Sequence, residues 1–139
     1  MVSPRLCVGA IFESTQCGQF WYTESMTFWN SLQQLVDKSI IKIDRPKDSV
    51  HPRYPDYIYP FDYGYLEGTT SGDGGGDGDG IDCWVGSLGG REVTGVVTVV
   101  DAVKGDCEIK ILIGCTSDDM QTILKCHKRG SMDGLLTEK

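Results

Sequence analysis

Two stretches of the chain repeat their apolar residues at the three- and four-residue spacing of an amphipathic helix. The first covers residues 27–38, and its apolar face is formed by Phe28, Leu32, Leu35 and Val36. The second covers residues 116–129, and its face is formed by Met120, Ile123, Leu124 and His127. Thr116 and Asp119 have the spacing of a capping box, in which two side chains satisfy free backbone donors where a helix begins. The pattern therefore predicts one helix early in the chain and one late.

Five shorter segments have the β-branched and aromatic content of strands, with Gly, Pro or Asp at their ends. They are residues 39–44, 57–66, 81–87, 92–100 and 106–114. In the last of them polar and apolar residues alternate, so Asp106, Glu108 and Lys110 fall on one face. No crossover helix separates the strands until late, which favours an antiparallel, barrel-like sheet of five strands in a mainly β or α+β fold. The last nine residues show no such pattern and are expected to fray.

The N-terminal residues differ from the rest of the chain. With 139 residues one domain is expected, and we assign it to residues 26–139. Residues 1–25 have no clear period and are interpreted as an N-terminal extension, for which disorder is one interpretation. A short apolar run after Arg5 leaves a signal peptide as an alternative.

No run of about 18 apolar residues occurs, so no membrane span is expected. None of the six cysteines forms a Cys-x-x-Cys pair, which indicates a reducing compartment, taken here as the cytoplasm, and no zinc site.

Charge and glycine content narrow the class of partner. The net charge of −7 argues against a nucleic acid, because phosphate backbones are bound by basic patches. Seven of the 18 glycines fall between Gly68 and Gly80, around an acidic loop. That loop holds four carboxylates: Asp73, Asp77, Asp79 and Asp82. Carboxylate oxygens are the ligands of hard divalent cations, so the loop is a candidate cation site. A solvated flexible loop is the alternative.

Three further groups of polar residues accompany the acidic loop. Asp101 and Asp106 bracket a tight turn after it. The aromatic segment Tyr59-Pro-x-x-Tyr63-Gly-Tyr65 precedes it. Arg53 lies further upstream in a proline-containing stretch, where an arginine can fork onto phosphate oxygens. Ordinary packing and solvated surface are the alternatives for these residues.

Taken in order, these motifs resemble the soluble inorganic pyrophosphatases of the first family. Asp77-Gly-Asp79-Gly-Ile-Asp82 looks like the Asp-x-Asp-x-x-Asp signature of that family. The tyrosine segment looks like the motif that precedes this signature there, and Asp101 with Asp106 matches its second acidic pair. The resemblance covers residues 40–114. It implies an OB-like five-stranded barrel and magnesium-dependent hydrolysis of pyrophosphate.

The resemblance also implies roles at the matching positions. The magnesium ligands would be Asp77, Asp82 and Asp106, with Asp101 binding a further metal that arrives with the substrate. Asp79 would be the base that accepts a proton from the attacking water, and Tyr63 would hydrogen-bond near that water. The substrate would be bound by Arg53, Tyr59 and Lys110. The chain departs from the family at Gly80, which replaces a proline, and at Glu108, which replaces a lysine. Lys110 lies on the same strand face and could take over for that lysine.

Several functions stay open at this stage. Hydrolysis of pyrophosphate, with pyrophosphate as partner, is the first hypothesis. The second is a non-catalytic barrel that binds divalent cations, because several phosphate-binding residues of the family are missing. A calcium-binding loop is weaker, since such loops work as tandem arrays. The net charge argues against an oligonucleotide-binding barrel. The oligomeric state stays open, a homo-oligomer included.

Overall fold

The computed structural model describes residues 27–71 and 80–139, so residues 1–26 and 72–79 lie outside the described part. The chain divides into two compact units, Met1–Ser31 and Leu32–Lys139. The first helix, α2 (Phe28–Lys38), spans this division. Thr27 caps it, because its Oγ1 accepts a hydrogen bond from the amide of Asn30 at 3.0 Å. The boundary expected between an extension at 1–25 and a domain at 26–139 stays a prediction.

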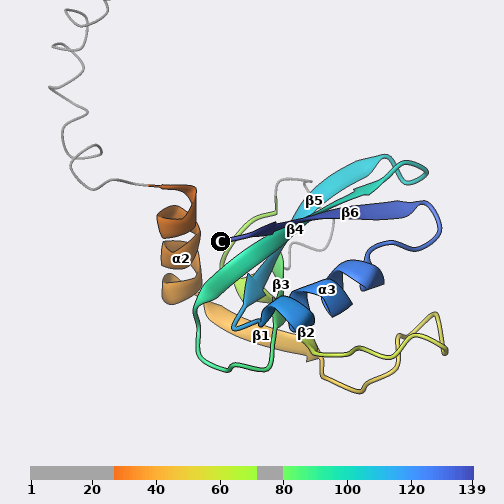
Figure 1. The fold of residues 1–139 in the computed structure, drawn as a ribbon, viewed down its shortest axis with the longest axis horizontal. Coiled ribbons are helices and arrows are strands. Elements are labelled where there is room, and N and C mark those ends of the chain that lie inside the picture. Colours follow the sequence, from red (N-terminus) through yellow and green to blue (C-terminus); the bar gives the residue numbers. More distant parts are fainter. Residues whose placement is uncertain (1–26, 72–79) are drawn as a thin grey trace, which may run out of the picture. The chain divides into compact units, whose positions relative to one another are not determined.

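The second unit is built on one mixed sheet (Figure 1). Its six strands are β1 (Ile40–Arg45), β2 (Asp62–Glu67), β3 (Ile81–Val85), β4 (Val93–Asp101), β5 (Asp106–Ile113) and β6 (Met132–Glu138). The order across the sheet is β1-β2-β3-β5-β4-β6, and only β3 and β5 are parallel neighbours. The mainly β architecture with two helices agrees with the expectation. The sheet has edges at β1 and β6, so in the described residues it is not closed into a five-stranded antiparallel barrel.

Strand β6 corrects the expectation that the last nine residues fray. It pairs with β4 from Asp101↔Met132 to Gly95↔Glu138. β6 is an edge strand and exposes much of its surface, with Leu135 68% exposed. Because an edge strand buries few side chains, its sequence shows only a weak alternation of apolar and polar residues, and Gly134 interrupts that alternation further. The sequence pattern was therefore too faint to predict the strand.

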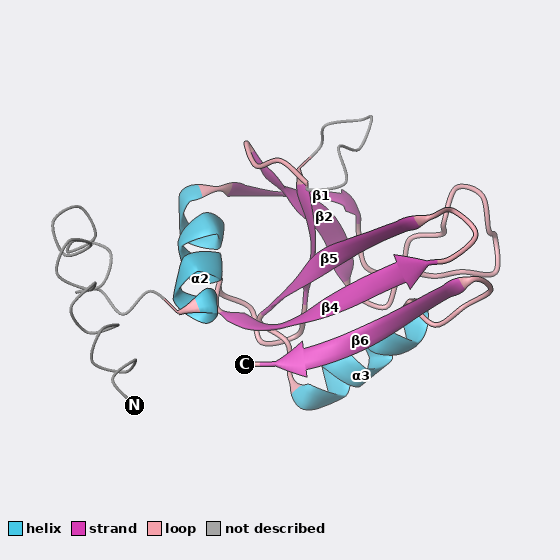
Figure 2. Cartoon of the chain, turned by 90° about the horizontal axis from the view of Figure 1, so that it is seen from above, coloured by secondary structure: helices cyan, strands magenta, loops and turns pink. Residues whose placement is uncertain are grey.

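Helix α3 (Ser117–Cys126) lies against β6 on one face of the sheet (Figure 2). The predicted capping box is present: Asp119 donates from its amide to Thr116 Oγ1 at 3.0 Å, and Thr116 donates back to Asp119 Oδ2 at 3.1 Å. The helix ends three residues earlier than the pattern suggested. The chain turns there through Gly130, whose φ of +60° lies in the left-handed region that glycine adopts without strain.

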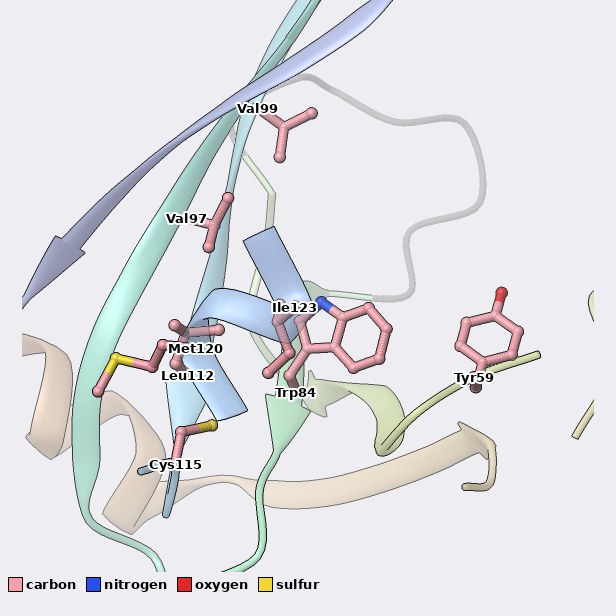
Figure 3. Close-up of a cluster of buried hydrophobic side chains, with 8 residues drawn as sticks. All are labelled: Tyr59, Trp84, Val97, Val99, Leu112, Cys115, Met120 and Ile123. Carbon is pink, nitrogen blue, oxygen red and sulfur yellow. The ribbon is translucent and has the colours of Figure 1, made fainter. Parts of the chain in front are cut away.

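The core combines strand side chains that alternation directs to one face of the sheet with side chains from α3 and the neighbouring loops. Its buried members are Tyr59, Trp84, Val97, Val99, Leu112, Cys115, Met120 and Ile123 (Figure 3). Trp84 is 1% exposed, and its partner in register, Leu112, is fully buried. Burying large side chains of this kind is worth about 1.5–3 kcal/mol each. This face of the sheet also continues into the polar residues of the candidate site.

The end of α2 is fastened to the start of β4 by polar contacts. Arg91 donates to the backbone carbonyls of Val36, in the last turn of α2, and of Ser39, directly after the helix. Gln33 Oε1 accepts from the amide of Val93 at 2.8 Å. In the described part of the chain no helix is long and apolar enough to cross a membrane. The four cysteines described there are free thiols: Cys83, Cys107, Cys115 and Cys126.

Candidate functional site

A loop of residues 46–61 between β1 and β2 brings aromatic side chains to the face that carries α3. Backbone hydrogen bonds hold the two sides of this loop together: Val50 and Ile58 form an isolated antiparallel β-bridge, and the amide of His51 donates to the carbonyl of Tyr57 at 2.9 Å. The strand expected at 57–66 joins the sheet only from Asp62 onward. Pro60 precedes this point and has no amide hydrogen to donate to a ladder.

A cavity of about 510 Å³ lies between this loop, the sheet and the turn after α3. Seven ring side chains line it: His51, Tyr54, Tyr57, Tyr59, Tyr63, Trp84 and His127. Charged side chains line it from β4, β5 and the turn after α3: Asp101, Glu108, Lys110 and Arg129. Four of the residues that the sequence assigned to the site therefore share this cavity, namely Tyr59, Tyr63, Asp101 and Lys110.

The rings form a connected wall and not a set of separate contacts. Tyr63 and Trp84 meet edge to face, with ring centroids 4.7 Å apart. The ring centroid of Tyr59 lies 5.8 Å from that of Tyr63 and 5.0 Å from that of Tyr57. Aromatic pairs at 4.5–7 Å contribute about 0.5–1.5 kcal/mol beyond their buried area. The wall is thus held in place by its own packing.

A buried polar network lies at the sheet end of the cavity, centred on the ammonium of Lys110. The Nζ atom donates to Asp82 Oδ2 at 2.5 Å, to Tyr63 Oη at 3.1 Å and to Glu108 Oε1. Tyr63 itself donates to Asp82 Oδ2 at 2.8 Å. The sheet register explains the convergence, because parallel β3 and β5 bring Asp82 beside Lys110. Lys110 lies beside Glu108 on the same face of β5, and its expected role in binding substrate stays a prediction.

The charges of this network shift its pKa values in consistent directions. Burial by itself lowers the pKa of Lys110, but the carboxylates of Asp82 and Glu108 outweigh it and raise that pKa above its ordinary value. Burial, followed by the negative charge of Asp82, raises the pKa of the Tyr63 hydroxyl well above its ordinary range. At neutral pH Lys110 is therefore charged, and Tyr63 keeps its proton as a hydrogen-bond donor. Two carboxylates face one ammonium, which leaves one negative charge in excess.

Asp101 and Asp106 lie opposite each other across the β4–β5 turn. Asp101 Oδ1 accepts from the amides of Val103 and Lys104 at 3.0 and 2.9 Å, and from Ser131 Oγ at 2.8 Å. The amide of Lys104, then the hydroxyl of Ser131, lower the pKa of Asp101. Asp106 pairs with the exposed Lys104 ammonium at 3.1 Å. The turn therefore presents two carboxylates, of which Asp101 is fixed in orientation.

The predicted metal ligands do not form one compact group in the part of the chain that is described. No set of three His, Cys, Asp or Glu residues suited to a metal occurs among residues 27–71 and 80–139. Asp106 precedes Lys110 by four residues on β5, which is about 13 Å along a strand, while Asp82 lies beside Lys110. Asp82 and Asp106 therefore cannot reach one magnesium ion, whose oxygen ligands lie about 2.1 Å away. Asp77 and Asp79 lie outside the described residues.

The guanidinium that lines the cavity is that of Arg129 and not that of Arg53. Arg53 is exposed in the 46–61 loop and does not line the cavity; its amide donates to His51 Nδ1 at 3.0 Å. Arg129 lines the cavity, with its guanidinium 4.8 Å from the centre of the Tyr57 ring. The sequence prediction missed Arg129. The basic cluster that follows α3 was the available signal, but its placement depends on β6.

His127 lies directly after α3 and is buried against the cavity. The indole nitrogen of Trp84 donates to His127 Nε2 at 3.0 Å. Burial, then the nearby charge of Lys110, lower the pKa of His127 to about 4. The ring is therefore neutral at pH 7, in agreement with the expectation of a buried side chain. It is nevertheless one of the residues that line the cavity, which the sequence did not indicate.

Comparison with known proteins assigns no function to this site. No protein-family model matches the chain, and no curated protein matches it in sequence.

Proposed function

We propose that this protein hydrolyses inorganic pyrophosphate with the help of magnesium. The observation that carries the proposal is the convergence of Tyr63, Asp82 and Lys110. These residues come from three separate stretches of sequence and form one buried network beside the cavity. Asp101, from a fourth stretch, lines the same cavity. Tyr63 and Lys110 have shifted pKa values, and titratable groups of this kind beside a cavity are typical of functional sites.

The carboxylates offer oxygen atoms that suit magnesium. Within the described residues the hydrogen bonds of Asp82 fall on Oδ2 and those of Asp101 fall on Oδ1. Each carboxylate therefore keeps its other oxygen for a ligand. Asp82 would serve one metal position, and Asp101 with Asp106 a second. Bound magnesium would neutralise the charge of the phosphate oxygens and lower the pKa of a water molecule bound to it.

The remaining residues of the site orient and hold the substrate. Tyr63 fixes the Asp82 carboxylate by donating to Oδ2. Lys110 is charged and reaches the same oxygen, so it would also attract a phosphate oxygen at the cavity surface. Arg129 would bind the leaving phosphate through its guanidinium, which suits phosphate geometry. Tyr59 would contact the substrate as part of the cavity wall.

Some parts of the proposal come from the sequence resemblance alone. Asp77 as a metal ligand and Asp79 as the base lie outside the described residues. A role for Arg53 would need the 46–61 loop to turn toward the substrate. The resemblance implies an OB-like barrel, and the described strands form an open sheet instead. The proposed function therefore depends on the site and not on barrel closure.

Two aspartate substitutions test the proposal. Asp82→Asn should weaken magnesium binding and remove most release of phosphate from pyrophosphate, because it removes a charged ligand. Asp79→Asn should reduce the rate and leave magnesium affinity largely unchanged, as expected for a base. Asp133→Asn is the matched control, since this exposed aspartate on β6 pairs with Lys128 and does not line the cavity. Unchanged turnover in Asp82→Asn would contradict the proposal.

One observation favours a second candidate, divalent-cation binding without turnover. Lys110 already neutralises part of the Asp82 charge, and a resident ammonium competes with a metal for that carboxylate. The chain would then bind a cation at the Asp101–Asp106 turn and lack hydrolysis. A magnesium-induced rise in melting temperature together with no phosphate release would favour this candidate.

A further inference from the structure

The cavity beside the polar network is larger and more aromatic than a diphosphate group needs. Its volume of about 510 Å³ falls within the roughly 300–1,000 Å³ of sites that hold drug-sized organic ligands. Pyrophosphate is compact and highly charged, and it would be served by cations and metal ions. Seven ring side chains are instead suited to a flat, weakly polar group, because such groups stack on aromatic faces.

A buried hydrogen-bond donor without a partner points to a ligand in this cavity. An indole N–H can only donate, so the bond from Trp84 requires His127 Nε2 to be the unprotonated acceptor. The neutral ring then carries its hydrogen on Nδ1. His127 is 7% exposed, and Nδ1 has no hydrogen-bond partner among the described residues. A buried donor left unsatisfied is unfavourable, so an acceptor atom of a ligand would complete the site.

The charges at the two ends of the cavity indicate what the ligand carries besides a ring. Arg129 and Lys110 would attract phosphate oxygens, as in the proposed hydrolysis. A quaternary ammonium compound is the other ligand class that aromatic cavities take. Two tyrosine faces already carry cations of the protein, however: Arg129 lies over Tyr57 and Lys110 over Tyr63. Those two ring faces are therefore taken, which disfavours a cationic ligand, and magnesium bound with the diphosphate would offset the excess negative charge of the Lys110 network.

We propose that the substrate is an organic diphosphate whose heterocyclic ring occupies this cavity, a nucleoside diphosphate in chemical class. The inference rests on the proposed hydrolysis. The ring would stack between the aromatic side chains, and a ring nitrogen or carbonyl would accept from His127 Nδ1. Water would add to the terminal phosphorus and release one proton to the solvent, the bond from that phosphorus to the bridging oxygen would break, and the bridging oxygen would leave with the nucleoside monophosphate. The products are one nucleoside monophosphate and one phosphate, and no electrons are transferred.

Calorimetric titration of the full chain with adenosine diphosphate, pyrophosphate and choline, each with magnesium, tests the inference. Adenosine diphosphate should bind at least tenfold more tightly than pyrophosphate, and phosphate should be released from it. Tyr54 is the variant position, because its ring lines the cavity while 58% of the residue is exposed, so its loss spares the core. Tyr54→Ala should weaken adenosine diphosphate binding about tenfold, and Tyr54→Phe, which keeps the ring, should not.

The outcomes separate the two proposals. Binding and turnover of pyrophosphate with no preference for adenosine diphosphate would overturn the ring site and leave pyrophosphate hydrolysis standing. Tight binding of adenosine diphosphate that depends on Tyr54, with no phosphate released from either compound, would support the ring site and overturn the hydrolysis. Choline binding more tightly than adenosine diphosphate would overturn the inference, and binding of none of the three compounds would overturn both proposals.

Discussion

Replacement of Lys110 by methionine should destabilise the fold substantially, although it removes a single charge. Lys110 is 5% exposed, and its ammonium contacts Asp82, Glu108 and Tyr63. Methionine fills similar space but leaves two neighbouring carboxylates without their cation. Removing one partner of a buried ion pair costs about 3–5 kcal/mol. The Asp82 and Glu108 side chains are 30% and 24% exposed, so water relieves part of the loss and the lower end of that range applies.

Thermal unfolding measured by circular dichroism at pH 7 in the presence of chelator gives the comparison. A loss of about 3 kcal/mol in a chain of this size corresponds to a fall in Tm of about 10–15 °C. Lys104→Met is the matched control, because Lys104 pairs with Asp106 at 3.1 Å but is 71% exposed. Exposed pairs contribute at most about 1 kcal/mol, so the control should lose no more than about 4 °C.

Magnesium adds a second readout to the same experiment. With the ammonium removed, Asp82 and Glu108 become more available to a divalent cation. Magnesium should therefore raise the Tm of Lys110→Met more than that of the wild type, since a ligand stabilises the state that binds it. If Lys110→Met melted within the range of the Lys104→Met control, the buried network would contribute little and the reasoning would be refuted.

Three other predictions follow from the structure. The pKa of His127 is lowered from 6.5 to about 4, so the neutral ring stabilises the fold fully above pH 6.5, and about 3 kcal/mol of that stability is lost as the pH falls toward 4. Denaturant unfolding across this pH range should show the loss. His127→Gln can still accept from Trp84 and should not show this pH-dependent loss. Asp119→Ala should lower the free energy of unfolding by about 2–3 kcal/mol in urea titrations, because Asp119 accepts from both the amide and the hydroxyl of Ser87 and completes the capping box. Thr116→Ala, which removes only the cap, should lose about 1 kcal/mol; a larger loss than in Asp119→Ala would contradict the assigned contacts.

Local sequence patterns predicted the elements whose signals are local. The capping box of α3 follows from two residues three positions apart, and the alternation in β5 directs Glu108 and Lys110 to one face. The early helix and four strand segments were expected near their observed bounds. Lys110 could be expected beside the acidic residues because strand alternation places it on their face.

Features that depend on long-range pairing could not be predicted in the same way. β6 pairs with β4 across about thirty residues at Asp101↔Met132, and its own pattern is weak. The parallel pairing of β3 with β5 is also set by the whole sheet, and it decides that Asp82 meets Lys110 while Asp106 lies further along. The bond from Trp84 to His127 joins residues 43 positions apart. No local pattern encodes such partners.

The release of phosphate from pyrophosphate by the full chain tests the central claim most directly. The assay compares magnesium, calcium alone and chelator at neutral pH. The convergence of Tyr63, Asp82 and Lys110 beside the cavity predicts turnover with magnesium that chelator abolishes. No phosphate release with magnesium, from protein whose Tm and circular dichroism confirm that it is folded, would contradict a hydrolytic site.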